Sequence, residues 1–184
     1  MIAVLPDPLA DYVARRDIAD ALARYMRGLD RLDEPLLRSA FHPDAWIDCG
    51  VHAGDLDGFV TFAFGFLGQM QASHHMLGQS RIALHDAASA SGESYFQAWH
   101  GITDAAGTAR DLFIAGRYVD AYACRDGHWR ITHRTLISEW ATETPATGRA
   151  HMDAPETIRS ARCGRDFSDA PPPVKRRRVG VVET

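Results

Sequence analysis

Apolar residues recur at three- and four-residue intervals over residues 15–30 and again over residues 56–70, and each stretch predicts a helix. The second stretch is rich in phenylalanine, which suits a helix that covers an apolar ligand. Asp33 is a good N-cap for a short helix over residues 34–41, because its carboxylate can accept hydrogen bonds from free N–H groups of the first turn. Gly28 is expected to loosen the last turn of the first helix.

The later part of the chain alternates apolar and polar residues and predicts strands. These strands cover residues 45–49, 74–85, 93–102, 110–124 and 128–140. Asp126 and Gly127 provide a turn that joins the last two strands as a hairpin. Helices therefore come first and an antiparallel meander follows, an order typical of an α+β domain with its helices on one face of the sheet.

Composition divides the chain into three parts. Residues 1–140 are expected to form one domain, and residues 141–170, where the periodicity fades, an arm that wraps around it. Residues 171–184 are proline-rich and then basic, and they are expected to form a disordered tail. Four adjacent cations repel each other, so a solvated tail is favoured over a nuclear localisation signal or an anionic docking patch.

Overall composition excludes several classes of protein. The formal net charge of −4 makes nucleic acid a poor partner, and 46% hydrophobic residues suffice for a sizeable core. Three cysteines without a CxxC pair suit a reducing compartment. No apolar run approaches the roughly 18 residues of a membrane span, and the N-terminus lacks the features of a secretion signal. We therefore expect a soluble, cytoplasmic protein that binds neither membranes nor nucleic acid.

Motifs for the common cofactors are also missing from the sequence. There is no HExxH or clustered cysteine pattern with the spacing of metal ligands. There is no GxGxxG, GxxxxGK[ST] or GxSxG motif either. The chemistry is therefore expected to need no metal and no cofactor.

Three segments, RYMRGLDRLD, SHHMLGQ and DGHWRITHRT, together resemble the nuclear transport factor 2-like superfamily, and most closely its SnoaL-like group. This group includes scytalone dehydratase, bile-acid 7α-dehydratase and hexachlorocyclohexane dehydrochlorinase. The resemblance covers about residues 11–140. It implies a cone-shaped barrel, in which a curved mixed or antiparallel sheet wraps around a long N-terminal helix with two further helices. It also implies a homo-oligomer, either a dimer or a trimer.

In these enzymes an aspartate at the end of the first helix pairs with a histidine on the strand after the third helix, positions that match Asp30 and His75. A neutral imidazole can take a proton near neutral pH, and a carboxylate on its far nitrogen fixes the tautomer. His74 must point to the opposite face of the strand, so only one of the two histidines can enter the pocket. Register favours His75, and the alternative is that one or both are half-buried strand residues bonded to backbone.

The resemblance also implies catalytic roles for Tyr25 and Arg134. A phenol can donate a hydrogen bond to a substrate oxygen, and a guanidinium can stabilise a leaving group or an oxyanion. Five residues turn an ideal helix by roughly 140°, so Tyr25 and Asp30 can share a cavity only if the helix unwinds near Gly28. The alternatives are that Tyr25 belongs to the core and that Arg134 forms a structural ion pair, for example with Asp120 or Glu139.

The chain departs from scytalone dehydratase at several pocket positions. Cys49 stands where that enzyme has a tyrosine, and Phe96 falls where its second histidine is expected. Tyr118 and Asp120 share a strand face and are expected to replace part of the missing polarity. His100 is as compatible with the pocket mouth as with a solvent-facing strand end. The candidate substrate-binding residues are Tyr118, Asp120, Phe96, Cys49, Trp46, Phe62, Phe66 and His74.

These residues predict a cofactor-independent lyase of the dehydratase type. A histidine held by an aspartate would remove a proton, and water would leave a hydrophobic steroid, polyketide or lignin-derived aromatic substrate. Isomerisation, cyclisation and retro-aldol release of formaldehyde could use the same pocket. A non-catalytic ligand-binding or assembly module, such as the small subunit of ring-hydroxylating dioxygenases, is the alternative from another class, because a fold does not fix a function.

Overall fold

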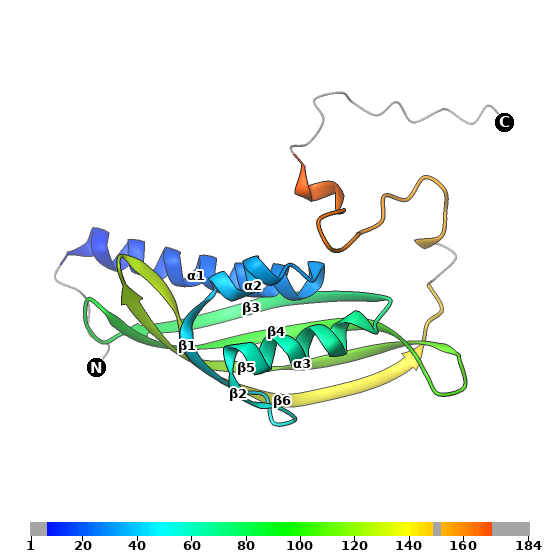
Figure 1. The fold of residues 1–184 in the computed structure, drawn as a ribbon, viewed down its shortest axis with the longest axis horizontal. Helices are drawn as coiled ribbons and strands as arrows, with labels where there is room; N and C mark the ends of the chain where they lie inside the picture. Colours follow the sequence, from blue (N-terminus) through cyan, green and yellow to red (C-terminus); the bar gives the residue numbers. More distant parts are fainter. Residues whose placement is uncertain (1–6, 149–151, 171–184) are drawn as a thin grey trace.

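A curved sheet packed against three helices forms the body of the protein (Figure 1). The computed structural model describes residues 7–148 and 152–170. The helices are α1 (Pro8–Arg31), α2 (Glu34–Ser39) and α3 (Leu56–Gly68), with a short 3₁₀ helix, η1 (Phe167–Asp169), in the arm. The strands are β1 (Phe41–Asp48), β2 (Ala53–Asp55), β3 (Ala72–Leu84), β4 (Ser89–Thr103), β5 (Ala109–Arg125) and β6 (His128–Pro145).

Helix α1 begins well before residue 15, where the prediction placed its start. Asp7 is its N-cap, because the Asp7 side chain accepts a hydrogen bond from the backbone N–H of Leu9 at 2.9 Å. Leu9 and Tyr12 are exposed, so the first turns lack the buried stripe that made the remainder of the helix predictable. None of the described helices is long and apolar enough to cross a membrane.

Gly28 does not loosen α1, contrary to the prediction. The helix continues to Arg31, and Gly28 marks the place where α2 crosses it. A Cβ atom on Gly28 would lie 2.7 Å from the Cα atom of Leu37, a residue that is fully buried. Glycine is therefore needed here for the close approach of two helices, and the helical geometry is undisturbed.

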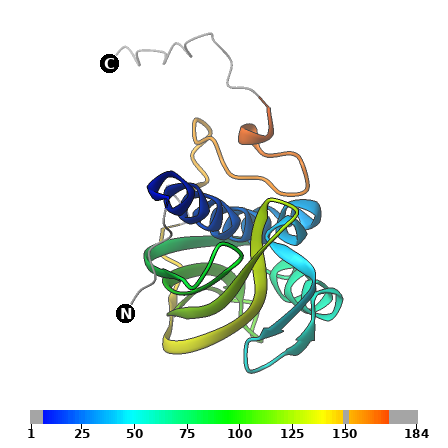
Figure 2. The same ribbon diagram turned by 90° about the vertical axis from the view of Figure 1, so that its left-hand side faces the viewer.

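The six strands follow the order β2-β1-β6-β5-β4-β3. Strand β1 runs parallel to β6, and the other neighbours are antiparallel, so that the sheet is mixed. The edge strands β2 and β3 do not pair with each other, which leaves the sheet open in the part of the chain that the structure describes. Figure 2 shows the sheet curling beneath α1, with α3 beside it. The predicted α+β cone is confirmed, whereas the three-residue strand β2 was not predicted.

The β5–β6 hairpin is confirmed, with Asp126 and Gly127 at positive φ values of 52° and 76°. Strand β6 extends further than expected. It continues to Pro145, which pairs with Arg110, so that the boundary predicted at residue 140 falls inside a strand. The predicted tail, residues 171–184, lies outside the described residues.

Residues 152–170 return to the body near the ends of α1 and α3 (Figure 1). The backbone N–H of Cys163 donates to the carbonyl of Arg31 at 2.9 Å. The guanidinium of Arg162 donates to the carbonyl of Leu67 at 3.0 Å. The arm therefore contacts the ends of two helices whose side chains line the interior.

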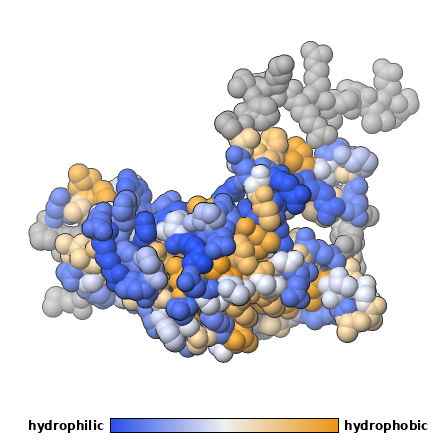
Figure 3. Space-filling view, viewed as in Figure 1, coloured by the Kyte–Doolittle hydropathy of each residue, from blue (hydrophilic) through white to orange (hydrophobic). Residues whose placement is uncertain are grey.

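Hydrophobic side chains gather in two exposed regions. Figure 3 shows one of them on the face that carries α3. The other is the outer face of β4 and β6, where Trp99 and Trp140 are 39% and 64% exposed.

Candidate functional site

A cavity of about 430 Å³ lies between α1, α3 and the inner face of the sheet. Its lining is mostly apolar, and α3 contributes Phe59, Phe62 and Phe66. Phe66 is 45% exposed, whereas Tyr25 and Tyr118 are 3% and 1% exposed. The cavity therefore opens near the end of α3 and is closed by the two tyrosines.

His75 and Asp30 form a tight pair at one side of this cavity. Nδ1 of His75 lies 2.7 Å from Oδ1 of Asp30. The backbone N–H of His75 also donates to the same carboxylate, 3.0 Å from each oxygen. This N–H is available because β3 is an edge strand, whose outward N–H groups lack a neighbouring strand. The carboxylate thus holds both the ring and the backbone of His75.

The contact with Asp30 determines which ring nitrogen of His75 carries the proton when the ring is neutral. An ionised carboxylate only accepts hydrogen bonds, so the proton of a neutral ring lies on Nδ1. Nε2 is then an unprotonated base, and His75 lines the cavity while Asp30 does not. Asp30 therefore reaches the cavity only through His75, which is why α1 need not unwind for Tyr25 to line the same cavity.

His74 lies on the outer face of the sheet and does not line the cavity. Its ring centroid is 6.2 Å from that of Trp99, also on the outer face. Adjacent residues of a strand alternate between faces, and His75 occupies the inner one. The prediction that His74 binds substrate is therefore corrected.

A second histidine, His100, lies beside His75 with ring centroids 5.1 Å apart. It is 3% exposed, and its Nδ1 is 3.3 Å from Oγ of Ser73. Burial and the neighbouring His75 lower the pKa of His100 to about 4, so its ring is neutral at physiological pH. Phe96, a substrate-binding candidate at the position expected for a second histidine, stacks on Tyr118 with ring centroids 4.4 Å apart and does not line the cavity, which corrects that prediction.

Tyr25 and Tyr118 keep their phenolic protons. Burial raises the pKa of Tyr25, although Arg134 and a hydrogen bond from Tyr118 oppose the shift. Burial and Tyr25 raise the pKa of Tyr118 well above its usual value. The closed end of the cavity thus carries phenols that remain protonated, in contact with one another.

Arg134 and Asp120 lie behind these tyrosines, outside the cavity. Nε and Nη2 of Arg134 each donate to one oxygen of Asp120 at 2.7 Å, and the residues are 1% and 3% exposed. Burial alone would lower the pKa of Arg134, but the charge of Asp120 and its hydrogen bonds raise the pKa of the guanidinium above its usual value. The Cζ atom of Arg134 lies 4.1 Å from the ring centroids of both Tyr25 and Tyr118. The geometry is that of a structural ion pair, which corrects the expected direct contact of both residues with substrate.

Cys49 lines the cavity and Trp46 does not. Burial raises the pKa of the Cys49 thiol, and the thiol donates to the carbonyl of His52 at 3.3 Å. Cys49 therefore lines the cavity as a protonated thiol. Trp46 faces solvent because its neighbour Ile47, 1% exposed, takes the inward position on β1. The expectation that Trp46 binds substrate is wrong for this reason.

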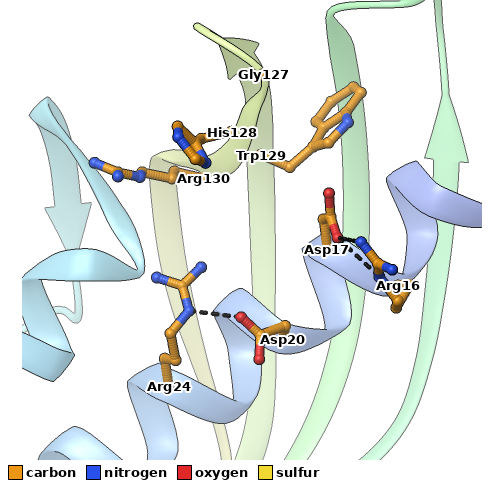
Figure 4. Close-up of a pocket in the computed structure, with 8 residues that line it drawn as sticks. All are labelled: Arg16, Asp17, Asp20, Arg24, Gly127, His128, Trp129 and Arg130. Carbon is orange, nitrogen blue, oxygen red and sulfur yellow. Dashed lines mark hydrogen bonds and ion pairs between the residues drawn. The ribbon is translucent and has the colours of Figure 1, made fainter.

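A second hollow of about 450 Å³ lies between α1 and the β5–β6 hairpin (Figure 4). Arg16 pairs with Asp17 at 2.6 Å and Arg24 pairs with Asp20 at 2.8 Å, both from the same helix. Ion pairs between neighbours on an exposed helix are ordinary surface features. The apolar cavity beside His75 is therefore the candidate site. Within residues 7–148 and 152–170, no group of three or more His, Cys, Asp or Glu residues is placed to hold a metal ion.

Comparison with solved structures finds the same fold in several proteins. A hexachlorocyclohexane dehydrochlorinase (LinA, type 2) superposes with a TM-score of 0.69 and 21% identity, covering 76% of this chain and 95% of that one. The type 3 LinA of Novosphingobium barchaimii superposes with a TM-score of 0.69 and 19% identity, covering 76% of this chain and 96% of that one. A scytalone dehydratase-like protein from Novosphingobium aromaticivorans superposes with a TM-score of 0.67 and 19% identity, covering 77% of this chain and 98% of that one. Identities of this size demonstrate a shared fold.

No curated protein sequence matches the chain significantly. The family model of the SnoaL-like domain, in contrast, matches residues 11–135, which is more than half of the chain and includes most of the residues that line the cavity. The chain therefore belongs to the SnoaL-like domain family, within the nuclear transport factor 2-like superfamily.

Proposed function

We propose that this protein is a cofactor-independent lyase that eliminates water from a hydrophobic β-hydroxy ketone. The observation that carries the proposal is the pair of His75 and Asp30, joined at 2.7 Å on the wall of an apolar cavity. The carboxylate holds the proton on Nδ1 and leaves Nε2 as the base. A residue pair with only a structural role has no need to direct a basic nitrogen into a ligand-sized space.

The elimination has two steps, and Nε2 of His75 acts in both. In the first, Nε2 takes the proton from the carbon next to the ketone, and the C–H electron pair forms the enolate. The resulting imidazolium is stabilised by Asp30. In the second, the enolate re-forms the ketone and expels the β-hydroxyl group, which leaves as water with the proton from the imidazolium. The products are a conjugated enone and water.

The lining indicates the class of substrate. A volume of about 430 Å³ falls within the range of roughly 300–1,000 Å³ for small-molecule sites. Phe59, Phe62 and Phe66 offer flat apolar surfaces, and the phenol of Tyr25 at the closed end remains protonated and can donate a hydrogen bond. Such a lining favours a flat, hydrophobic ketone, such as a steroid, polyketide or lignin-derived aromatic. Similarity of fold to dehydrochlorinases and to a scytalone dehydratase-like protein supports elimination chemistry.

We also propose that the protein is a homo-oligomer, a dimer or trimer formed through the outer face of the sheet. Trp99, Met76 and Trp140 are each between 39% and 64% exposed on this face. A second copy would remove these side chains from water, which is the main favourable contribution to association. Light scattering of the purified protein tests this proposal, and replacement of Trp99 by Ser should shift the mass toward the monomer.

A panel of fused-ring β-hydroxy ketones tests the activity. Formation of the enone is followed by its ultraviolet absorbance, with thermal denaturation in parallel to report binding. We expect turnover by the wild type and a loss of at least about 10²-fold in His75→Gln, the usual contribution of a general base. His74→Gln, on the outer face, is the matched control and should keep its activity.

Two outcomes would contradict the proposal. Stabilisation by ketones without product from any of them would indicate a binding module. Equal rates for the wild type and His75→Gln would show that the elimination does not use this base.

A further inference from the structure

The C-terminal arm places an arginine against the residues that hold the second histidine of the cavity. Nη1 of Arg162 donates to the carbonyls of Leu67 and Met70, both at 3.0 Å. Nη2 of Arg162 donates to Oγ of Ser73 at 2.8 Å. Ser73 is 7% exposed and stands at the start of β3, two residues before His75. One side chain of the arm thus connects the end of α3 to the wall of the cavity.

The hydroxyl of Ser73 has one hydrogen to donate, and its partners determine where that hydrogen goes. Arg162 carries only donors, so it occupies a lone pair of Oγ and leaves the hydrogen free. Two acceptors are within reach, Nδ1 of His100 at 3.3 Å and Sδ of Met70 at 3.9 Å. A thioether is a weak acceptor, whereas a bare imidazole nitrogen is a good one. Donation to Nδ1 of His100 is therefore the stronger of the two hydrogen bonds open to Ser73, provided that this nitrogen carries no proton.

We propose that Arg162 and Ser73 form a relay that holds neutral His100 in the tautomer with its proton on Nε2. His100 then presents a hydrogen-bond donor to the cavity beside the unprotonated Nε2 of His75. The two rings, 5.1 Å apart, form a complementary pair of one donor and one acceptor. Arg162 is thus a positioning residue that acts through Ser73, and the arm completes the site.

The surroundings of His100 agree with a neutral ring. Burial lowers its pKa first, the adjacent His75 and Arg162 of the arm lower it further, and Asp30 alone opposes them. Arg162 therefore contributes twice, because it repels a proton on His100 and polarises the hydroxyl that hydrogen-bonds to its Nδ1. The arm is held in this position by independent contacts, including the Cys163 N–H to the Arg31 carbonyl.

For catalysis this inference rests on the proposed function: the Nε2–H of His100 would donate to the departing hydroxyl or to the ketone oxygen while His75 carries the proton. The tautomer is a property of the free protein and is measured without any substrate. A correct tautomer without turnover would therefore count against the lyase proposal alone, and turnover with the opposite tautomer would count against the relay alone.

Long-range ¹H–¹⁵N correlation spectra of the full chain, labelled with ¹⁵N-histidine, identify the protonated nitrogen of each ring. Replacement of His100 by Gln assigns its signals. In the wild type we expect a bare Nδ1 and a protonated Nε2. Ser73→Ala removes the donor and should populate the other tautomer, whereas Ser73→Thr keeps the hydroxyl and should restore the original spectrum.

Arg162→Gln tests the contribution of the arm, with Arg159→Gln as its matched control. Arg159 lies on the same arm and pairs with Asp153 at 2.8 Å, away from the site. Removal of the charge at position 162 should raise the pKa of His100 from about 4 toward the ordinary value of 6.5, and Arg159→Gln should leave it unchanged.

The wild-type spectrum decides the proposal even if Ser73→Ala does not fold. A proton on Nδ1 of His100 in the wild type would overturn the relay. An unchanged titration of His100 in Arg162→Gln would overturn the contribution of the arm.

Discussion

The carboxylate of Asp30 binds His75 at two points, the ring Nδ1 at 2.7 Å and the backbone N–H at 3.0 Å. The two contacts join the last turn of α1 to an edge strand and fix the ring relative to its own backbone. A ring whose position is fixed in this way loses little entropy when it takes up a proton or contacts a ligand. The pairing of an edge strand with a helix end is therefore also what orients the proposed base.

Asp30→Asn tests this arrangement. The amide can still accept the backbone N–H, but its NH₂ group, if it faces Nδ1, would favour a ring with its proton on Nε2. We expect the activity to fall by at least about 10²-fold, with a small change in stability. Measurement of kcat/KM and of urea unfolding separates the two effects. Asp20→Asn, on the solvent side of the same helix, is the control, and a loss of activity there would contradict the assignment.

The buried ion pair of Arg134 and Asp120 should matter for stability. Asp120→Asn leaves the arginine, which is 1% exposed, without its carboxylate, and the loss of one buried partner costs about 3–5 kcal/mol. Urea denaturation should show a correspondingly lower free energy of unfolding. The double variant Arg134→Met/Asp120→Leu removes both charges and should recover a large part of the loss. A cost below about 1 kcal/mol for Asp120→Asn would show that the pair contributes little.

Gly28 and Gly65 provide a matched pair of glycine-to-alanine substitutions within helices. At Gly28 the new methyl group would lie 2.7 Å from the Cα atom of Leu37, so α2 must move, at a cost of about 1–3 kcal/mol. At Gly65 there is no atom within 4 Å of the added Cβ, and alanine should stabilise the helix by about 0.5–1 kcal/mol. We therefore expect the two substitutions to change the free energy of unfolding in opposite directions, as measured by thermal or urea denaturation. A neutral Gly28→Ala would contradict the close approach of the helices.

Local patterns explain which parts of this fold were predictable. The stripe of apolar residues over 15–30 and the turn at Asp126 and Gly127 are local, and both elements are present. Strand parity likewise separated His75 from His74, because neighbours on a strand must face opposite sides. The pairing with Asp30 came from the family resemblance, since residues so far apart in the chain share no local pattern.

Long-range register and packing explain what was not predicted. His100 reaches His75 because of the β3–β4 register, which shifts between Leu77 and Ser80, and no local sequence signal sets that shift. The crossing of α2 at Gly28 and the docking of Arg162 onto backbone carbonyls also depend on segments distant in sequence. Such contacts are determined by the assembled fold and produce no periodic pattern in the sequence.

The buried, neutral His100 should make stability depend on pH in a defined window. Its pKa is about 4 in the folded protein and 6.5 in an unperturbed histidine, so between these values the unfolded chain binds more protons. The contribution of His100 to the free energy of unfolding is therefore fully present above pH 6.5. It decreases by about 3 kcal/mol as the pH falls toward 4. Urea unfolding of the wild type and His100→Gln across this range isolates the contribution, because carboxylates titrate equally in both. The exposed His128→Gln should retain the wild-type slope, and equal slopes for all three proteins would mean that His100 is charged or accessible in the folded state.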